Sequence, residues 1–221
     1  MSDPVYRAGP AAGVPYMLKR GLSDLKTNLA VIMLHGWSGD EQVMWVLENV
    51  LPKTKLMAAL RGLFPVQGSG YQWAEIPGYP QEAMDNYRAG GRAVLCVVDE
   101  LAAEDGLDRD EVILMGFSQG AGLSFSLVGL GMLVPRAIIC LAGFLPQGDL
   151  SLFAGLPVFW GHGTKDELVP VGRARTDVDR LHEAGADVTY CEADVGHRLG
   201  IECTRGLKGW FETLQKDEHA P

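Results

Sequence analysis

The sequence lacks the positive charge that binding to nucleic acids or anionic membranes requires. It has 19 Lys and Arg residues against 28 Asp and Glu, which gives a formal net charge of −9. No stripe of basic residues runs along it, so contacts with nucleic-acid phosphates and anionic lipid surfaces are disfavoured. We therefore expect no nucleic acid among its partners, and we interpret the acidity as a contribution to solubility.

Segments that would carry the chain into or across a membrane are also missing. The N-terminus has no basic region followed by the apolar stretch of a signal peptide. The longest apolar segment, residues 123–134, is interrupted by serines and glycines and is too short to span a bilayer. We expect a cytoplasmic protein without integral membrane association.

Cysteine is scarce and is not arranged for metal binding. The four cysteines are Cys96, Cys140, Cys191 and Cys203. None forms a C-x-x-C pair, and no histidine lies at a ligand spacing from them. Cys96 and Cys140 lie inside apolar runs, where cysteine acts as a small hydrophobic residue. These features predict reduced cysteines and no metal site.

The chain shows no internal repeat, no low-complexity segment and no linker. Its 221 residues, 47% of them hydrophobic, fit one domain with a large core. We expect a single domain over residues 1–221, with loose ends at 1–13 and 215–221.

Strand-like apolar runs alternate with longer amphipathic segments. This alternation is typical of an α/β fold with a mostly parallel central sheet and helices on both faces. We expect strands at 14–19, 29–34, 54–60, 112–115, 136–141, 157–160 and 188–191, helices at 40–50, 84–104, 119–133, 171–184 and 204–214, and a loop at 65–80.

The most informative segment is Gly116-Phe117-Ser118-Gln119-Gly120. An apolar strand-like run precedes it and a helix-like segment of small residues follows, which is the context of a G-x-S-x-G nucleophile elbow. A side chain at Gly116 or Gly120 would collide with backbone in so tight a turn. The motif alone is weak evidence in a glycine-rich chain, so the flanking strand and helix carry the inference.

A serine nucleophile needs a general base and an acid that orients it. In this architecture the chain order is Ser, then Asp or Glu, then His. Asp166 follows the strand expected at 157–160, and His197 follows the one at 188–191. We predict Ser118 as nucleophile, His197 as general base and Asp166 as orienting acid. Glu167 and Asp194 are rival acids, which we interpret as solvated loop charges.

The other four histidines receive structural interpretations. His35 lies in a turn after a strand, and His162 lies before Asp166, where it could face the site but more often makes a local hydrogen bond. His182 falls on the polar side of an amphipathic helix, and His219 lies in the tail.

The oxyanion of an acyl transfer needs two hydrogen-bond donors. The backbone N–H of Gln119 follows the nucleophile at a helix N-terminus, where the helix dipole adds to it. The loop Leu34-His35-Gly36-Trp37-Ser38 follows an early strand, and we predict the Trp37 N–H as second donor. Gly36 would let the backbone approach closely.

These residues resemble the phospholipase/carboxylesterase family of α/β hydrolases, which includes acyl-protein thioesterases and small bacterial carboxylesterases. The matching pieces are Leu34-His35-Gly36-x-x-Gly39-Asp40-Glu41, Gly68-x-Gly70-Tyr71-x-Trp73, the elbow, Asp166-x-Leu168-Val169-Pro170 and Gly196-His197. The resemblance implies the same triad and oxyanion donors. It also implies that Tyr71, Trp73 and Leu168 lie near the acyl pocket, that neither a cofactor nor a metal is used, and that a homodimer is possible.

The expected activity is hydrolysis of small-molecule carboxylic esters through an acyl-enzyme, without a large lid, since no long insertion separates the strands. The rate should fall at acid pH as His197 takes up a proton. An acyl-protein thioesterase or lysophospholipase would use the same chemistry on long acyl chains. A ligand-binding protein without catalysis is an alternative of a different class.

Overall fold

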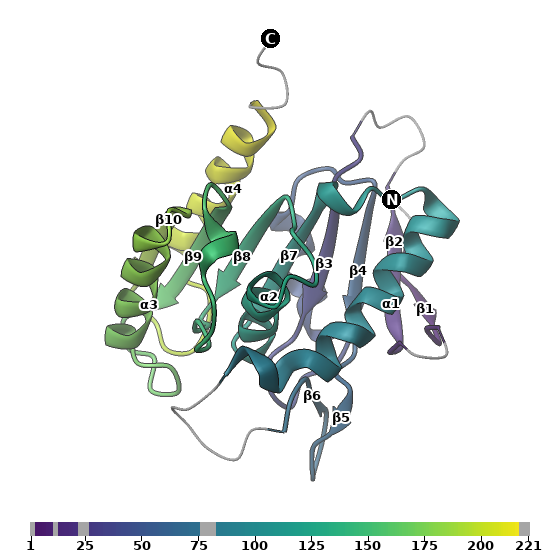
Figure 1. Cartoon of the computed structure of the whole chain (residues 1–221), viewed down its shortest axis with the longest axis horizontal. Coiled ribbons are helices and arrows are strands. Elements are labelled where there is room, and N and C mark those ends of the chain that lie inside the picture. Colours follow the sequence, from purple (N-terminus) through teal and green to yellow (C-terminus); the bar gives the residue numbers. More distant parts are fainter. Residues whose placement is uncertain (1–2, 11–12, 22–26, 76–82, 217–221) are drawn as a thin grey trace.

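The computed structural model describes residues 3–10, 13–21, 27–75 and 83–216. Its centre is an eight-stranded sheet in the order β1-β2-β4-β3-β7-β8-β9-β10 (Figure 1). In this spatial order, each strand from β4 to β10 pairs in parallel with the next. β1 pairs antiparallel with β2, and β2 pairs antiparallel with β4. The bounds are β1 Val5–Arg7, β2 Tyr16–Arg20, β3 Ala30–Leu34, β4 Leu56–Leu60, β7 Val112–Phe117, β8 Ala137–Leu141, β9 Pro157–Gly163 and β10 Asp187–Ala193.

Helices cover both faces of this sheet, as expected from the alternating pattern. One apolar cluster contains Ile32 and Leu34 of β3 together with α1 (Arg88–Asp105), α2 (Gln119–Gly129) and α3 (Val171–Glu183). The opposite cluster contains Val31 and Met33 with the 3₁₀ helix η1 (Val43–Val50) and α4 (Ile201–Lys216). Strands buried on both sides need apolar residues throughout, which explains the unbroken apolar runs. In the described part of the chain, no helix is long and apolar enough to cross a membrane.

Several boundaries differ from those expected. The segment expected as a helix at 40–50 is the 3₁₀ helix η1, and the segment at 84–104 divides into η2 (Met84–Tyr87) and α1. Two short 3₁₀ turns, η3 (Arg109–Glu111) and η4 (Ser151–Phe153), precede β7 and β9. The expected loop at 65–80 contributes to a small hairpin of β5 (Phe64–Pro65) and β6 (Tyr71–Gln72), and residues 76–80 lie outside the described residues.

Parts of both segments expected as loose ends belong to regular elements. Residues 5–7 form β1, which pairs with β2, and Arg7 forms an ion pair with Glu104 at 2.5 Å. Only tertiary contacts hold so short and exposed a strand, which explains why its sequence gave no signal. At the other end α4 continues to Lys216, and residues 217–221 lie outside the described residues.

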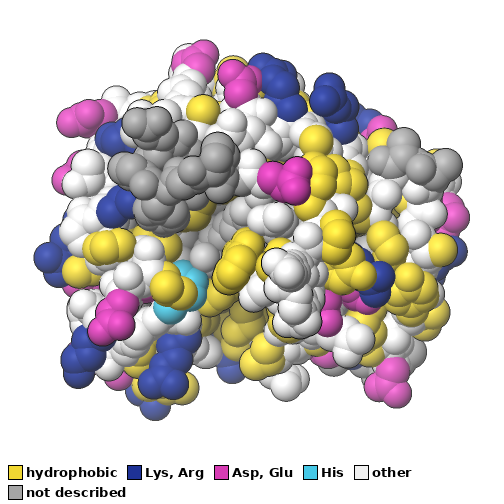
Figure 2. Space-filling model, turned by 90° about the horizontal axis from the view of Figure 1, so that it is seen from below, with side chains coloured by type: hydrophobic (Ala, Val, Ile, Leu, Met, Phe, Trp, Pro, Cys, Tyr) yellow, Lys and Arg dark blue, Asp and Glu magenta, His cyan; other side chains and the backbone are white. Residues whose placement is uncertain are grey.

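The parallel strands all point to one edge of the sheet, where open α/β sheets carry their ligand sites. Figure 2 views the molecule from the side of these carboxyl ends. Hydrophobic side chains cross the middle of this face, and a histidine reaches the surface among them.

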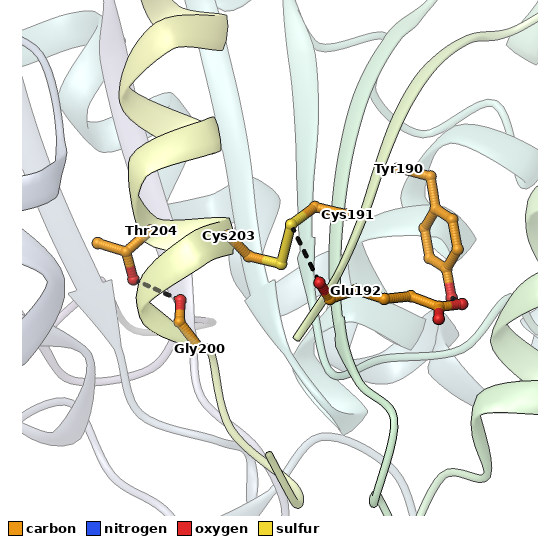
Figure 3. Close-up of a disulfide and its surroundings, with 6 residues drawn as sticks. All are labelled: Tyr190, Cys191, Glu192, Gly200, Cys203 and Thr204. Atoms are coloured by element: carbon orange, nitrogen blue, oxygen red, sulfur yellow. Dashed lines mark hydrogen bonds between the residues drawn. A yellow bond between two sulfur atoms is a disulfide. The ribbon is translucent and has the colours of Figure 1, made fainter. Parts of the chain in front are cut away.

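The expectation that all cysteines are reduced was also wrong. Cys191 of β10 and Cys203 in the first turn of α4 form a disulfide (Figure 3). The two are 12 residues apart in sequence, and they meet because α4 packs back against β10. Cys96 and Cys140 are free. Persistent disulfides are more typical of oxidising compartments, so the cysteines no longer support a cytoplasmic location.

The disulfide predicts a thiol count and a stability difference. Unfolded in denaturant without reductant, the protein should expose two reactive thiols, and four after reduction. Replacing both Cys191 and Cys203 by Ala should lower the free energy of unfolding by about 3 kcal/mol, because a short loop in the unfolded chain is no longer closed. Urea unfolding measures this.

Cys96→Ser is the matched control, since Cys96 is free and half-buried. It should remove one thiol and leave the urea midpoint nearly unchanged. Four thiols before reduction would contradict the pairing.

Candidate active site

The registers of the sheet determine which loops meet at its carboxyl edge. Leu34 of β3 pairs with Gly116 of β7, so the residues that follow each strand run side by side. Gly163 of β9 likewise pairs with Ala193 of β10. The backbone N–H of Lys165 continues this second pairing by donating to the carbonyl oxygen of Val195 at 3.0 Å. Two neighbouring loop pairs therefore form the site.

Ser118 stands between β7 and α2 in a strained conformation. Its φ of 51° and ψ of −114° are rarely adopted by L residues, at a cost of about 1–3 kcal/mol. Its N–H donates to the Leu141 carbonyl at 2.9 Å, which fixes the turn to β8. A Cβ on Gly116 would collide with the Ala121 nitrogen, and one on Gly120 with the Leu34 carbonyl. The predicted need for glycine at these two positions is confirmed.

Asp166 and His197 are joined by a hydrogen bond. The Nδ1 of His197 lies 2.7 Å from the Oδ2 of Asp166, whose side chain is fully buried. The other oxygen, Oδ1, accepts from the N–H groups of Leu168 and Val169, each at 2.9 Å. Both oxygens of this buried carboxylate are therefore hydrogen-bonded.

The rival acids lie elsewhere. Asp194 is exposed and pairs with Lys165 at 2.8 Å. Glu167 is also exposed. Neither carboxylate has the buried, hydrogen-bonded setting that Asp166 has.

His197 also contacts the elbow. Its ring meets the ring of Phe117 edge to face, with 4.9 Å between the centroids. Phe117 is the residue directly before Ser118. This contact brings the Asp166–His197 pair to the strand end that carries the serine.

The loop after β3 approaches the same point from the other side. A Cβ built on Gly36 would lie 2.9 Å from the Phe117 ring and 3.3 Å from the Cβ of Ser118, so a side chain at this position would crowd the elbow. Gly39 donates to the Gly36 carbonyl at 3.1 Å, and Ser38 has a positive φ of 63°. In such a turn the N–H of the first central residue, Trp37, is not used by the turn itself.

The side chain of Trp37 is 61% exposed. Across from this loop, the N–H of Gln119 opens α2 and has no partner within that helix. The two backbone groups named as oxyanion donors thus belong to segments that flank Ser118.

The three residues expected near the acyl pocket differ in their surroundings. Leu168 is 67% exposed, and Tyr71 is half-buried beneath the guanidinium of Arg61, 4.8 Å from its ring centroid. Trp73 has no exposed surface, and its indole N–H donates to the His35 carbonyl at 2.8 Å. The structure therefore gives Trp73 a place in the core beneath the loop after β3 rather than a surface that a ligand can reach.

Two supporting interactions went unrecognised in the sequence. The Gln119 side chain accepts from the Trp73 N–H at 2.9 Å and donates to the Ala74 carbonyl at 3.0 Å. Arg61 binds both carboxylate oxygens of buried Glu41, at 2.5 and 2.7 Å. Glu41 closes one of the family motifs, and that was the available signal. Together these contacts hold the segments that surround the elbow.

Two buried histidines have fixed tautomers. Nε2 of His35 accepts from the Gly62 N–H at 2.8 Å, so Nδ1 carries the proton and donates to the Gly36 carbonyl at 2.6 Å. Nδ1 of His162 accepts from the Trp160 indole at 3.3 Å, so Nε2 carries the proton. Burial is the main cause that lowers the pKa of both histidines.

The predicted structural role of His35 is confirmed by these bonds. His182 is exposed on α3, as expected. His219 lies outside the described residues.

Comparison with known proteins agrees with this arrangement. The family model described as phospholipase/carboxylesterase matches residues 23–214. The chain belongs to this family. The resemblance inferred from the short motifs therefore extends over most of the sequence, and the sheet order is that of an α/β hydrolase.

Relatives within the family carry hydrolase names. The chain is 24% identical over 199 residues to the putative hydrolase MhqD of Bacillus subtilis, covering 89% of this chain and 97% of that protein. It is 28% identical over 168 residues to acyl-protein thioesterase 1 of Kluyveromyces lactis, covering 64% and 71% of the two chains.

Solved structures share the fold. A carboxylesterase from Mesorhizobium loti superposes with a TM-score of 0.82 at 23% identity, covering 96% of this chain and 99% of the other. At this identity the likeness concerns the fold.

The lowered pKa values of His35 and His162 predict that the folded protein is less stable at acid pH. Both lie below the ordinary value of 6.5, so the unfolded chain takes up protons that the folded chain does not. Below about pH 6.5 the free energy of unfolding should therefore fall, by at most about 1.4 kcal/mol per pH unit for each histidine. The urea midpoint should be lower at about pH 5.5 than at about pH 7.5.

His162→Gln removes one titrating group, so its urea midpoint should depend less steeply on pH over the same interval. A wild-type midpoint that does not change across it would contradict the assignment of two neutral histidines.

Proposed function

We propose that the protein is a serine hydrolase that cleaves carboxylic esters through an acyl-enzyme, with Ser118 as nucleophile, His197 as general base and Asp166 as orienting acid. The observation that carries this proposal is the 2.7 Å bond between His197 and buried Asp166, brought against the strained Ser118 elbow by the contact with Phe117. Family membership supports hydrolase chemistry at this place.

The Asp166–His197 bond determines which nitrogen can act as base. Because Nδ1 donates to the carboxylate, Nε2 is the nitrogen left to accept the Ser118 proton. As the hydroxyl attacks the ester carbonyl, His197 becomes an imidazolium next to the charged carboxylate. It then gives its proton to the leaving alcohol, and a water molecule repeats the sequence to release the acid.

The negative charge on the tetrahedral intermediate needs donors that are already oriented. We assign this role to the backbone N–H groups of Gln119 and Trp37. The α2 dipole adds to the first donor. The turn from Gly36 to Gly39 supports the second, because it leaves the Trp37 N–H outside its own hydrogen bond.

The substrate proposed for this site is a small ester with an apolar acyl group. Trp37 and Leu168 expose apolar surface on the two loops next to the proposed triad. A long-chain thioester is the second candidate, and the relative named acyl-protein thioesterase 1 favours it. Acyl-length preference distinguishes the two, since a long-chain enzyme should discriminate steeply against short esters.

Ser118→Ala should abolish hydrolysis of p-nitrophenyl esters, lowering kcat by about 10⁴-fold or more, since no other group can form the acyl-enzyme. A series from acetate to dodecanoate, with wild type and variant in parallel, measures both the loss and the acyl-length profile.

Ser151→Ala is the matched control, because Ser151 is exposed in η4, which precedes the amino end of β9, whereas the elbow follows the carboxyl end of β7. It should retain full activity. A folded Ser118→Ala protein that keeps the wild-type rate would overturn the proposal, as would a wild type inactive on every ester in the series.

Leu168→Ala should lower kcat/KM for the octanoate ester by about tenfold, because lost apolar contact costs about 0.8 kcal/mol per methylene. The acetate ester should change by less than about twofold, because it has no chain to lose contact with.

Leu152→Ala removes another exposed leucine, 46% exposed in η4, and should change neither rate. Equal losses on octanoate and acetate in Leu168→Ala would exclude Leu168 from the acyl path.

A further inference from the structure

A chain of hydrogen bonds runs from the core to the proposed acid. It begins on β9, where Trp160 and His162 are two residues apart and therefore project from the same face of the strand. Trp160 is buried and stacks on Phe125 of α2, with 5.3 Å between the ring centroids. Its indole N–H donates to Nδ1 of His162, whose ring is also buried.

An indole can only donate, so His162 must accept at Nδ1 and carry its proton on Nε2. The Nε2 proton points to the loop after β9, where the Val169 carbonyl lies 2.8 Å away. The Oδ2 of Asp166 lies 3.5 Å from the same nitrogen. His162 therefore donates its only ring proton to Val169, in the segment that begins at Asp166.

Val169 links this histidine to the carboxylate. Its carbonyl accepts from His162, while its N–H donates to Asp166 at 2.9 Å. Holding the carbonyl holds the planar peptide that follows Val169, and the hydrogen bond of its N–H holds the peptide that precedes it, so together the two bonds restrict the movement of Val169. Asp166 in turn aligns His197 through its other oxygen.

We propose that His162 is a positioning residue for the hydrolase, acting through Val169 to hold the Asp166 carboxylate in the orientation that His197 needs. This rests on the proposed function of Asp166 and His197. His162 itself touches neither Ser118 nor the substrate in this assignment. It supplies one neutral N–H donor at a defined place, and its ring is kept in that tautomer by Trp160.

Two amide variants separate the donor from the rest of the ring. Glutamine can place an amide N–H where Nε2 of histidine lies, whereas asparagine is one methylene shorter and reaches only the place of Nδ1. His162→Asn should lower kcat about 10–100-fold, by analogy with the loss seen when outer hydrogen-bond partners of metal-ligating histidines are removed, with KM nearly unchanged. His162→Gln should restore most of the rate. His182→Asn, on the exposed side of α3, should behave as wild type.

The kinetics are compared at matched folding, judged by Tm. A loss in His162→Asn that His162→Gln does not share supports the proposal. Equal activity of both variants, whether both match wild type or both are impaired alike, overturns it. A change confined to KM overturns it as well.

Nitrogen-15 NMR of wild-type protein supplies a measurement that needs no variant to fold. The imidazole of His162 should show its proton on Nε2, and a proton on Nδ1 would overturn the proposal. An inactive wild type would instead count against the proposed function and leave this tautomer measurement interpretable by itself.

Discussion

Parallel hydrogen bonding among β3, β7, β8, β9 and β10 is the constraint on which the rest of the molecule depends. Because these strands run in one direction, their carboxyl ends reach the same edge of the sheet. The registers then decide which loops meet there: β3 brings Gly36 beside Ser118, and β9 and β10 bring Asp166 beside His197. The strand pairing alone brings together residues that are tens of positions apart in sequence.

At the same edge of the sheet, two features cost free energy that packing in the surrounding core has to offset. Ser118 is held in a strained conformation, and the Asp166 carboxylate is removed from water. Two backbone donors and the His197 ring satisfy the carboxylate, and the Leu141 carbonyl anchors the elbow. Strain and buried charge at one place, compensated by packing elsewhere, are common where a site is organised in advance of its ligand.

Local signals predicted much of this arrangement. Apolar runs buried on both faces and helical periodicity identified the parallel sheet, and the tight turn at Gly116 and Gly120 requires glycine whatever the rest of the chain does. Features that depend on tertiary contacts were not predictable. The burial of Trp73 depends on how its segment folds under the loop after β3, β1 exists through pairing with β2, and the Cys191–Cys203 bond depends on how α4 returns to β10.

That last bond changes the covalent topology of the chain. Residues 191–203 form a closed ring, and His197 lies within it. If a protease cut the backbone anywhere between the two cysteines, the sulfur bridge would still join α4 to β10, and the apolar face of the helix could stay on the sheet. In this molecule, a backbone break within residues 191–203 and detachment of α4 are therefore separate events.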